Sequence, residues 1–182
     1  MGTFKKTFKM FNVEAEEQVQ VFLERTEMLN YNAVELLDPV LSVTFDRVIL
    51  LKDKAIVQGN IYKNIIYKDE NFFVRHEIVT IPVTATVEIP GFNPTVTVGR
   101  ANRAVVTNNV VDIGPDNQGN TNGFDIQIFV KQLTAFQRLI NANEVEEKII
   151  LDFILKISKF DQIDLEIPAP PRVFEFRNVI DP

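Results

Sequence analysis

The stretch EIVTIPVTATVEI, residues 77–89, decides the fold because apolar and polar residues alternate along most of its length. An alternation with a period of two places one face of a β-strand against a core and the other face in solvent. The residues expected to point inward are those at the odd positions, Val79, Ile81, Val83, Ala85, Val87 and Ile89. Several of them are β-branched, which suits a pleated surface.

Three further stretches show the same period: VEAEEQVQVFL (13–23), FDIQIFV (124–130) and VEEKIILDFILKI (145–157). Their expected inward residues are Val13, Ala15, Val19, Val21, Leu23, Phe124, Ile126, Ile128, Val130, Val145, Ile149, Leu151, Phe153, Leu155 and Ile157. Turn-forming residues separate the strands at 51–55, 68–72, 90–94 and 114–123. This spacing predicts an all-β fold, an antiparallel β-sandwich that is jelly-roll-like.

Two short segments, 30–38 and 133–143, are compatible with helices, and we expect short helices there if the chain contains any. Pro82 and Pro90 lack the amide hydrogen that a sheet ladder needs. We therefore expect both prolines at sheet edges, bulges or strand ends.

Composition excludes several classes of function. The chain has 182 residues, a net charge of −6 and no cysteine, so it has neither a disulfide framework nor a thiolate zinc site. An acidic surface repels nucleic acid, and no segment contains the ~20 apolar residues that a membrane helix needs. The first residues do not resemble a secretory signal, so we expect synthesis in the cytoplasm without export and no membrane partner.

Few residues are candidates for chemistry. His76 is the only histidine and lies within a predicted strand, so we interpret it as a structural residue rather than a lone catalytic base. Asp112, Asp116 and Asn117 lie in a segment rich in oxygen ligands, and they are weak calcium candidates because their spacing does not match an EF-hand. We find neither a phosphate-binding loop nor a nucleophile elbow, so we predict no enzymatic activity and no cofactor.

The two ends of the chain differ from the middle. Residues 1–12 form a predicted N-terminal arm with three lysines and no acid, and either a helix or a strand would place most of its apolar residues on one face. Residues 13–167 form the predicted sandwich domain. Residues 168–182 contain a proline-rich hinge, PAPP, and then VFEFRNVI, which alternates like a strand. We predict that the two ends contact another subunit through Phe4, Phe8, Met10, Phe11, Val173, Phe174, Phe176, Val179 and Ile180.

The alternative for the C-terminal strand is that it folds back onto its own domain. Burial of its five apolar side chains contributes on the order of 10 kcal/mol. Ordering about eight residues costs roughly 1–2 kcal/mol each, so the two contributions nearly cancel. An exchanged strand therefore needs a second contact, such as the N-terminal arm, to hold a lasting assembly. A contact of this kind closes a ring or extends a filament.

The segments VQGNI, IIYKDE, HEIVTIP and VEIPG within residues 55–91, with ELLDPVLSVTFDRVILLKDK before them, resemble the SPOCS domain of spore coat and spore morphogenesis proteins. The resemblance covers residues 36–140. It implies a structural role in the outer layers of an endospore, with synthesis in the mother cell. Three hypotheses stay open: a subunit that assembles with copies of itself into a filament or coat layer, an adaptor that docks on other spore coat proteins, and an enzyme or carbohydrate-binding module. The third ranks last, because the chain has no tryptophan and three tyrosines for sugar stacking.

Overall fold

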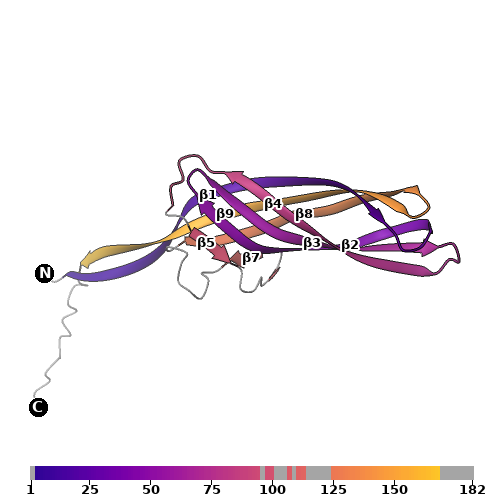
Figure 1. Ribbon diagram of the computed structural model, residues 1–182. Coiled ribbons are helices and arrows are strands. Elements are labelled where there is room, and N and C mark those ends of the chain that lie inside the picture. Colours follow the sequence, from indigo (N-terminus) through magenta and orange to yellow (C-terminus); the bar gives the residue numbers. More distant parts are fainter. Residues whose placement is uncertain (1–2, 95–96, 101–105, 108–109, 114–123, 169–182) are drawn as a thin grey trace, which may run out of the picture.

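The structure is a computed structural model that describes residues 3–94, 97–100, 106–107, 110–113 and 124–168 (Figure 1). These residues form nine β-strands and no helix. The strands are β1 (Thr3–Met28), β2 (Ala33–Leu51), β3 (Lys54–Asp69), β4 (Val74–Glu88), β5 (Thr97–Arg100), β6 (Val106–Thr107), β7 (Val110–Ile113), β8 (Phe124–Asn141) and β9 (Glu144–Pro168). The expected helices at 30–38 and 133–143 are wrong, because these segments lie mostly in β2 and β8.

Two antiparallel sheets pack face to face, which confirms the predicted β-sandwich. One sheet has the strand order β1-β9-β8-β7-β6, and the other has the order β4-β3-β2-β5. Most neighbours within a sheet are consecutive strands, so the sandwich consists of two meanders rather than the crossed connections of a complete jelly roll. One long-range pairing closes the first sheet, because β1 lies along β9 from one end to the other.

The predicted alternation forms the core. Residues 81–89 of the opening stretch point inward at every odd position and are buried, and so are the expected residues of β9. Phe45 of β2 meets Phe153 of β9 across the two sheets, with ring centroids 5.2 Å apart. Val13 is an exception, since it is exposed. A register shift between Val13 and Ala15 turns it to the outer face of the sheet.

A buried ion pair divides this core into two apolar clusters. Lys63 of β3 donates a hydrogen bond to Glu147 of β9, and both side chains are fully buried. Ile61 and Ile149 lie on one side of the pair in the main cluster, whereas the smaller cluster on the other side contains Ile65 and Val145. The Glu147 Oε2 atom has no hydrogen-bond partner among the residues that the structure describes. Opposite charges that pair across the two sheets favour the register in which they meet.

Turns and prolines follow the expected chemistry. The β2–β3 turn has Asp53 at a positive φ of 60°, and the turn after β4 has Gly91 at 84°. Pro82 lies in β4, which is an edge strand, and Pro90 lies just beyond the end of β4, so both expectations are confirmed. At Gly59 of β3 a Cβ atom would collide with the backbone oxygen of Thr44 on β2. The close approach of these two strands therefore requires glycine.

One part of the first sheet extends beyond the sandwich (Figure 1). The pairing of β8 with β9 begins at Phe124 and Lys159, so residues 160–168 of β9 pair only with residues 3–11 of β1. We call these two segments the terminal ribbon. The N-terminal arm is thus a strand and not a helix. It is continuous with the first strand of the sandwich and is hydrogen-bonded to its own chain.

Candidate functional site: the terminal ribbon and the opposite end

The register of the terminal ribbon sorts its residues onto two different faces. Directly paired residues share a face of an antiparallel sheet. Ile163 and Leu165 alternate along β9 and share one face, and Met10 of β1 lies on the same face because it pairs with Asp161. Thr7 and Phe11 of β1 lie on the other face. We call the face that carries Met10, Ile163 and Leu165 the apolar face.

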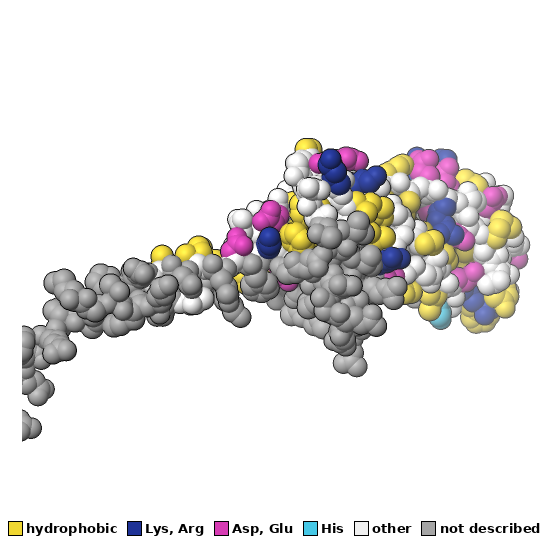
Figure 2. All heavy atoms as spheres, turned by 60° about the vertical axis from the view of Figure 1, so that its left-hand side comes forward, with side chains coloured by type: hydrophobic (Ala, Val, Ile, Leu, Met, Phe, Trp, Pro, Cys, Tyr) yellow, Lys and Arg dark blue, Asp and Glu magenta, His cyan; other side chains and the backbone are white. Residues whose placement is uncertain are grey.

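The apolar face continues the core-facing side of β9 beyond the place where the second sheet ends. Odd-numbered residues of β9 from Val145 to Ile157 face the core, and Ile163 and Leu165 follow in the same alternation. Ile163, Leu165 and Met10 are exposed, and Figure 2 shows a small group of hydrophobic side chains at one place on this projecting part of the molecule. A two-stranded ribbon is marginally stable in water unless a further layer covers its apolar face. This face is the first candidate docking surface.

The predicted contact residues fall partly on this ribbon. Met10 and Phe11 are exposed on opposite faces, and Phe4 and Phe8 lie in β1 at positions whose backbone pairs with Ile167 and Ile163. Val173, Phe174, Phe176, Val179 and Ile180 lie outside the described residues. Sequence reasoning missed Ile163 and Leu165, although their alternation with Gln162 and Asp164 was a visible signal.

The end of the sandwich opposite the ribbon is built from three connections (Figure 1). They are the β1–β2 connection (29–32), the β3–β4 turn (70–73) and the β8–β9 turn (142–143). Leu29 N donates to Asn143 O at 2.8 Å and Ala33 N donates to Ala142 O at 2.6 Å, which ties the first connection to the third. We call this region the far end.

Asp69 organises the β3–β4 turn. Its Oδ1 atom accepts hydrogen bonds from the backbone amides of Asn71 at 2.9 Å and Phe73 at 3.0 Å. Its Oδ2 atom accepts a hydrogen bond from Arg75 Nε at 2.9 Å. Burial on its own would raise the pKa of Asp69, but the hydrogen bonds from Arg75, Phe73 and Asn71 outweigh it and hold that pKa below its usual value. The carboxylate therefore stays charged and keeps the turn closed.

A hollow of about 290 Å³ lies beside this turn. Its lining residues are Asn30, Tyr31, Tyr67, Val74, Arg75, His76 and Glu77. Glu77 Oε1 accepts hydrogen bonds from the Tyr67 hydroxyl and from the backbone amide of Asn30, each at 2.7 Å. Desolvation and the hydrogen bond to Glu77 raise the pKa of Tyr67 to about 12. The guanidinium of Arg75 lies over the Tyr31 ring, 4.5 Å from its centroid.

The far end also exposes large apolar side chains. Phe72 is 75% exposed and Phe73 is 63% exposed, and Tyr31 and Val74 beside them are exposed as well. Phe72 has a φ of 63°, a left-handed conformation that is rare for a bulky residue. Sequence reasoning treated 68–72 only as a turn and missed these aromatic residues. Two consecutive phenylalanines within turn chemistry were the signal that could have identified them.

The residues that the sequence singled out for chemistry do not come together in a site among the described residues. His76 is exposed on β4 at the rim of the hollow. Asp112 lies in β7, whereas Asp116 and Asn117 lie outside the described residues, so calcium binding stays a prediction. No group of three or more acidic or histidine side chains with metal-binding geometry occurs in the described part of the chain.

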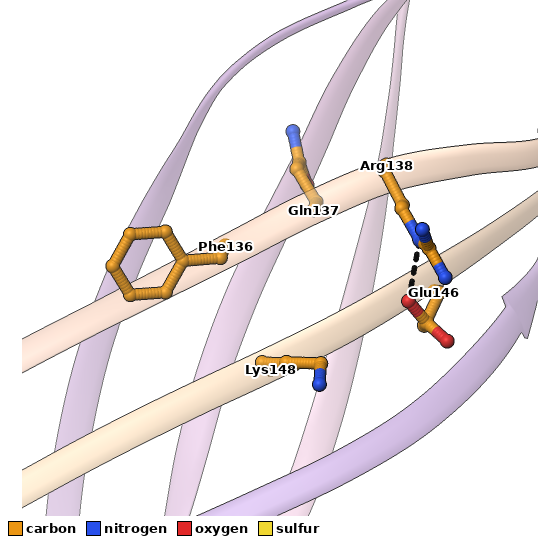
Figure 3. A pocket seen from close by; sticks show the side chains of 5 residues that line it. All are labelled: Phe136, Gln137, Arg138, Glu146 and Lys148. Carbon is orange, nitrogen blue, oxygen red and sulfur yellow. Dashed lines mark hydrogen bonds and ion pairs between the residues drawn. The ribbon is translucent and has the colours of Figure 1, made fainter.

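A second hollow, of about 260 Å³, lies on the outer face of the first sheet (Figure 3). There Arg138 of β8 donates to Glu146 of β9 at 2.6 Å, and Lys148 pairs with Glu24 of β1 at 2.7 Å. Phe136 points away from the Arg138–Glu146 pair (Figure 3). These cross-strand charges satisfy one another and form an ordinary solvated sheet face.

Comparison with known proteins identifies one region. Residues 36–113, from β2 to β7, match the family model described as SipL, SPOCS domain. This match bears out the resemblance to the SPOCS domain seen in the sequence and suggests a spore-associated protein. No curated protein and no solved structure matches the chain. Within the described residues there is no helix with the length and apolar character needed to cross a membrane.

Proposed function

We propose that this protein is a structural subunit of the bacterial endospore surface that assembles with copies of itself through its chain ends. The observation that carries the proposal is the terminal ribbon, which extends the core-facing side of the first sheet where the second sheet no longer covers it. The SPOCS match supports the spore setting. The assembled form is a filament, an appendage or a coat layer, and no catalytic function is required.

Strand addition is the proposed joint. Residues 169–182 follow directly from the end of β9, and residues 174–180 supply the strand that a neighbouring sheet receives. The free energy gained by burying the apolar side chains of one added strand is nearly cancelled by the entropy cost of ordering that strand, so a second contact is needed. The apolar face of the terminal ribbon supplies it, because Met10, Ile163 and Leu165 are exposed on two strands that already pair with each other. Since that pairing already holds the backbone, burying these side chains adds little backbone ordering cost.

Removal of residues 168–182 tests the joint. We expect the full chain to form particles much larger than one subunit in size-exclusion chromatography with light scattering, and to form regular assemblies in electron micrographs. The shortened chain should keep its cooperative thermal unfolding and run as a monomer. Normal assembly of the shortened chain would refute the proposed role of the C-terminal strand.

The same measurement distinguishes the second candidate, an adaptor that docks on another coat protein. An adaptor runs as a small defined species even when the chain is intact. The matched control is Phe136→Ser, because Phe136 is exposed on the outer face of the first sheet and pairs with Lys148, well before the ribbon segment of β9 begins. This variant should assemble like the unaltered chain, whereas the pair Ile163→Ser and Leu165→Ser should not.

A further inference from the structure

We propose that the outer edge of β1, along residues 15–28, receives the C-terminal strand of a second copy of the chain. We call this stretch the acceptor edge. The occupant is residues 173–180, which lie outside the described residues. The inference rests on the proposed function and deepens it, because it names the sheet edge at which the strand is added.

The acceptor edge is unpaired and regular. β1 is the end strand of the first sheet, so it pairs only with β9 among the strands that the structure describes. From Ala15 to Met28 this pairing runs without a register shift, and the stretch contains neither proline nor glycine. β1 follows the side of the sandwich from the terminal ribbon to the far end (Figure 1). A regular row of unpaired backbone amides and carbonyls is a template for strand addition.

The other long free edges of the sandwich carry features that oppose strand addition. Pro82 interrupts β4, the end strand of the second sheet, and lacks the amide hydrogen that an added strand would use. The part of β2 that extends beyond its pairing with β5 contains Pro39 and a register shift between Leu37 and Val40. On the same side, Gln137 of β8 donates to the Leu37 carbonyl at 2.7 Å and joins the two sheets. These comparisons favour β1 as the acceptor.

The inner face of the acceptor edge leaves apolar surface uncovered. Val19, Val21 and Leu23 pack against the main cluster but are only partly buried, whereas the β9 residues paired with them are fully buried. The difference arises because β1 has a neighbouring strand on one side only. An added strand places its side chains with Cβ atoms roughly 4.5–5.5 Å from those of β1. It therefore covers the apolar surface that β1 exposes at the rim of the sandwich.

Residues 173–180 carry a matching pattern. Phe174, Phe176 and Ile180 alternate along the segment, so a strand places them on one face. Phe174 and Phe176 have the same spacing as Val19 and Val21 on β1. Pairs between an aromatic and a β-branched side chain on neighbouring strands are among those that stabilise a sheet.

The length of the chain assigns this strand to a second copy. β9 ends at Pro168, which pairs with Thr3 at the start of β1, so Val19 lies roughly 50 Å further along β1. The segment from Pro168 to Phe176 spans at most roughly 29 Å when it is fully extended. A chain therefore cannot place Phe176 on its own acceptor edge. The contact joins two different surfaces, and it grows into a filament unless the rotation closes a ring.

Disulfide trapping between two variants tests the acceptor edge, since the chain has no native cysteine. One variant carries Phe176→Cys and the other carries Val21→Cys. Assembled together from reduced subunits and then mildly oxidised, they should give a covalent dimer on a non-reducing gel, whereas each alone should give monomers. Val19→Cys offers a second acceptor position for a pairing shifted by two residues. The matched control is Ile78→Cys, because Ile78 is exposed on β4, the edge strand of the other sheet.

Light scattering of the unaltered chain, measured alongside, separates this inference from the proposed function. If the unaltered chain assembles but neither acceptor position forms a dimer with Phe176→Cys, the acceptor edge is wrong while the proposed function stands. An equal yield of dimer with Ile78→Cys also overturns the choice of β1. If the unaltered chain is itself monomeric, the proposed function fails and this inference fails with it. A covalent dimer that forms only with a cysteine on the acceptor edge supports the inference.

Discussion

The buried Lys63–Glu147 pair makes the sharpest prediction about stability. Replacing Glu147 by leucine leaves the Lys63 ammonium fully buried without its counter-ion. Breaking a buried pair by removing one partner costs about 3–5 kcal/mol, because the remaining charge is left without compensation. For a domain of this size that loss lowers the melting temperature by on the order of 10 °C. Replacing Lys63 by methionine in the same variant should restore most of the loss, since two apolar side chains then join the two clusters.

The pH dependence of the single variant gives a second readout. Desolvation lowers the pKa of Lys63, and the hydrogen bond and charge of Glu147 oppose that shift. Without Glu147 the folded-state pKa falls further below the unfolded value of 10.5. The unfolded chain then binds more protons than the folded chain between these two values, so stability rises with pH across that interval. The Glu147→Leu variant should therefore recover stability as the pH is raised above neutrality, more steeply than the unaltered chain.

Urea unfolding followed by circular dichroism, for all four members of the double-mutant cycle, measures these effects. The expected result is a large loss for each single variant and a small change for the double variant. Equal and additive losses in the two single variants would refute the reasoning, because they would show that the two charges do not interact. A Glu147→Leu variant whose stability does not depend on pH would refute the account of Lys63.

Three further predictions concern the sheets and the turn. Gly59→Ala should destabilise the fold by well over the ~1 kcal/mol range of ordinary surface changes, because the new methyl group meets the Thr44 carbonyl; thermal unfolding measures this. Phe153→Ala should cost about 3–5 kcal/mol in urea unfolding through the cavity it leaves. Asp69→Ala should lower the amide hydrogen-exchange protection factors of residues 70–73, and acid should lower them too once the pH falls through the lowered pKa of Asp69, because its bond from Arg75 is then lost.

The strands could be predicted where one face is apolar and the other polar. Residues 77–89 and 145–157 follow that rule, and the structure buries the expected side. Segment 133–143 misled the prediction because both of its faces carry apolar residues. Leu133 and Leu139 are partly buried, whereas Phe136 and Ile140 are exposed. This mixture resembles the spacing of an amphipathic helix, and pairing with β9 overrides the local pattern.

The candidate surfaces were less predictable because they depend on contacts distant in sequence. The amphipathic residues of the N-terminal arm were visible, but the choice between helix and strand depends on pairing with residues 159–168, far along the chain. The sequence also showed Lys63 and Glu147 at positions where the alternation of their strands would place an apolar residue. That these charges face each other across the sheets follows only from the fold. The exposure of Phe72 and Phe73 could not be predicted because a turn pattern indicates where a chain reverses, and not which side chains it exposes.

Light scattering of the unaltered chain and of the variant carrying Ile163→Ser and Leu165→Ser tests the central claim most directly, because both side chains are exposed on the terminal ribbon. The account predicts particles much larger than one subunit for the unaltered chain and a cooperatively folded monomer for the variant. Assembly of the variant to the same extent as the unaltered chain would contradict the account.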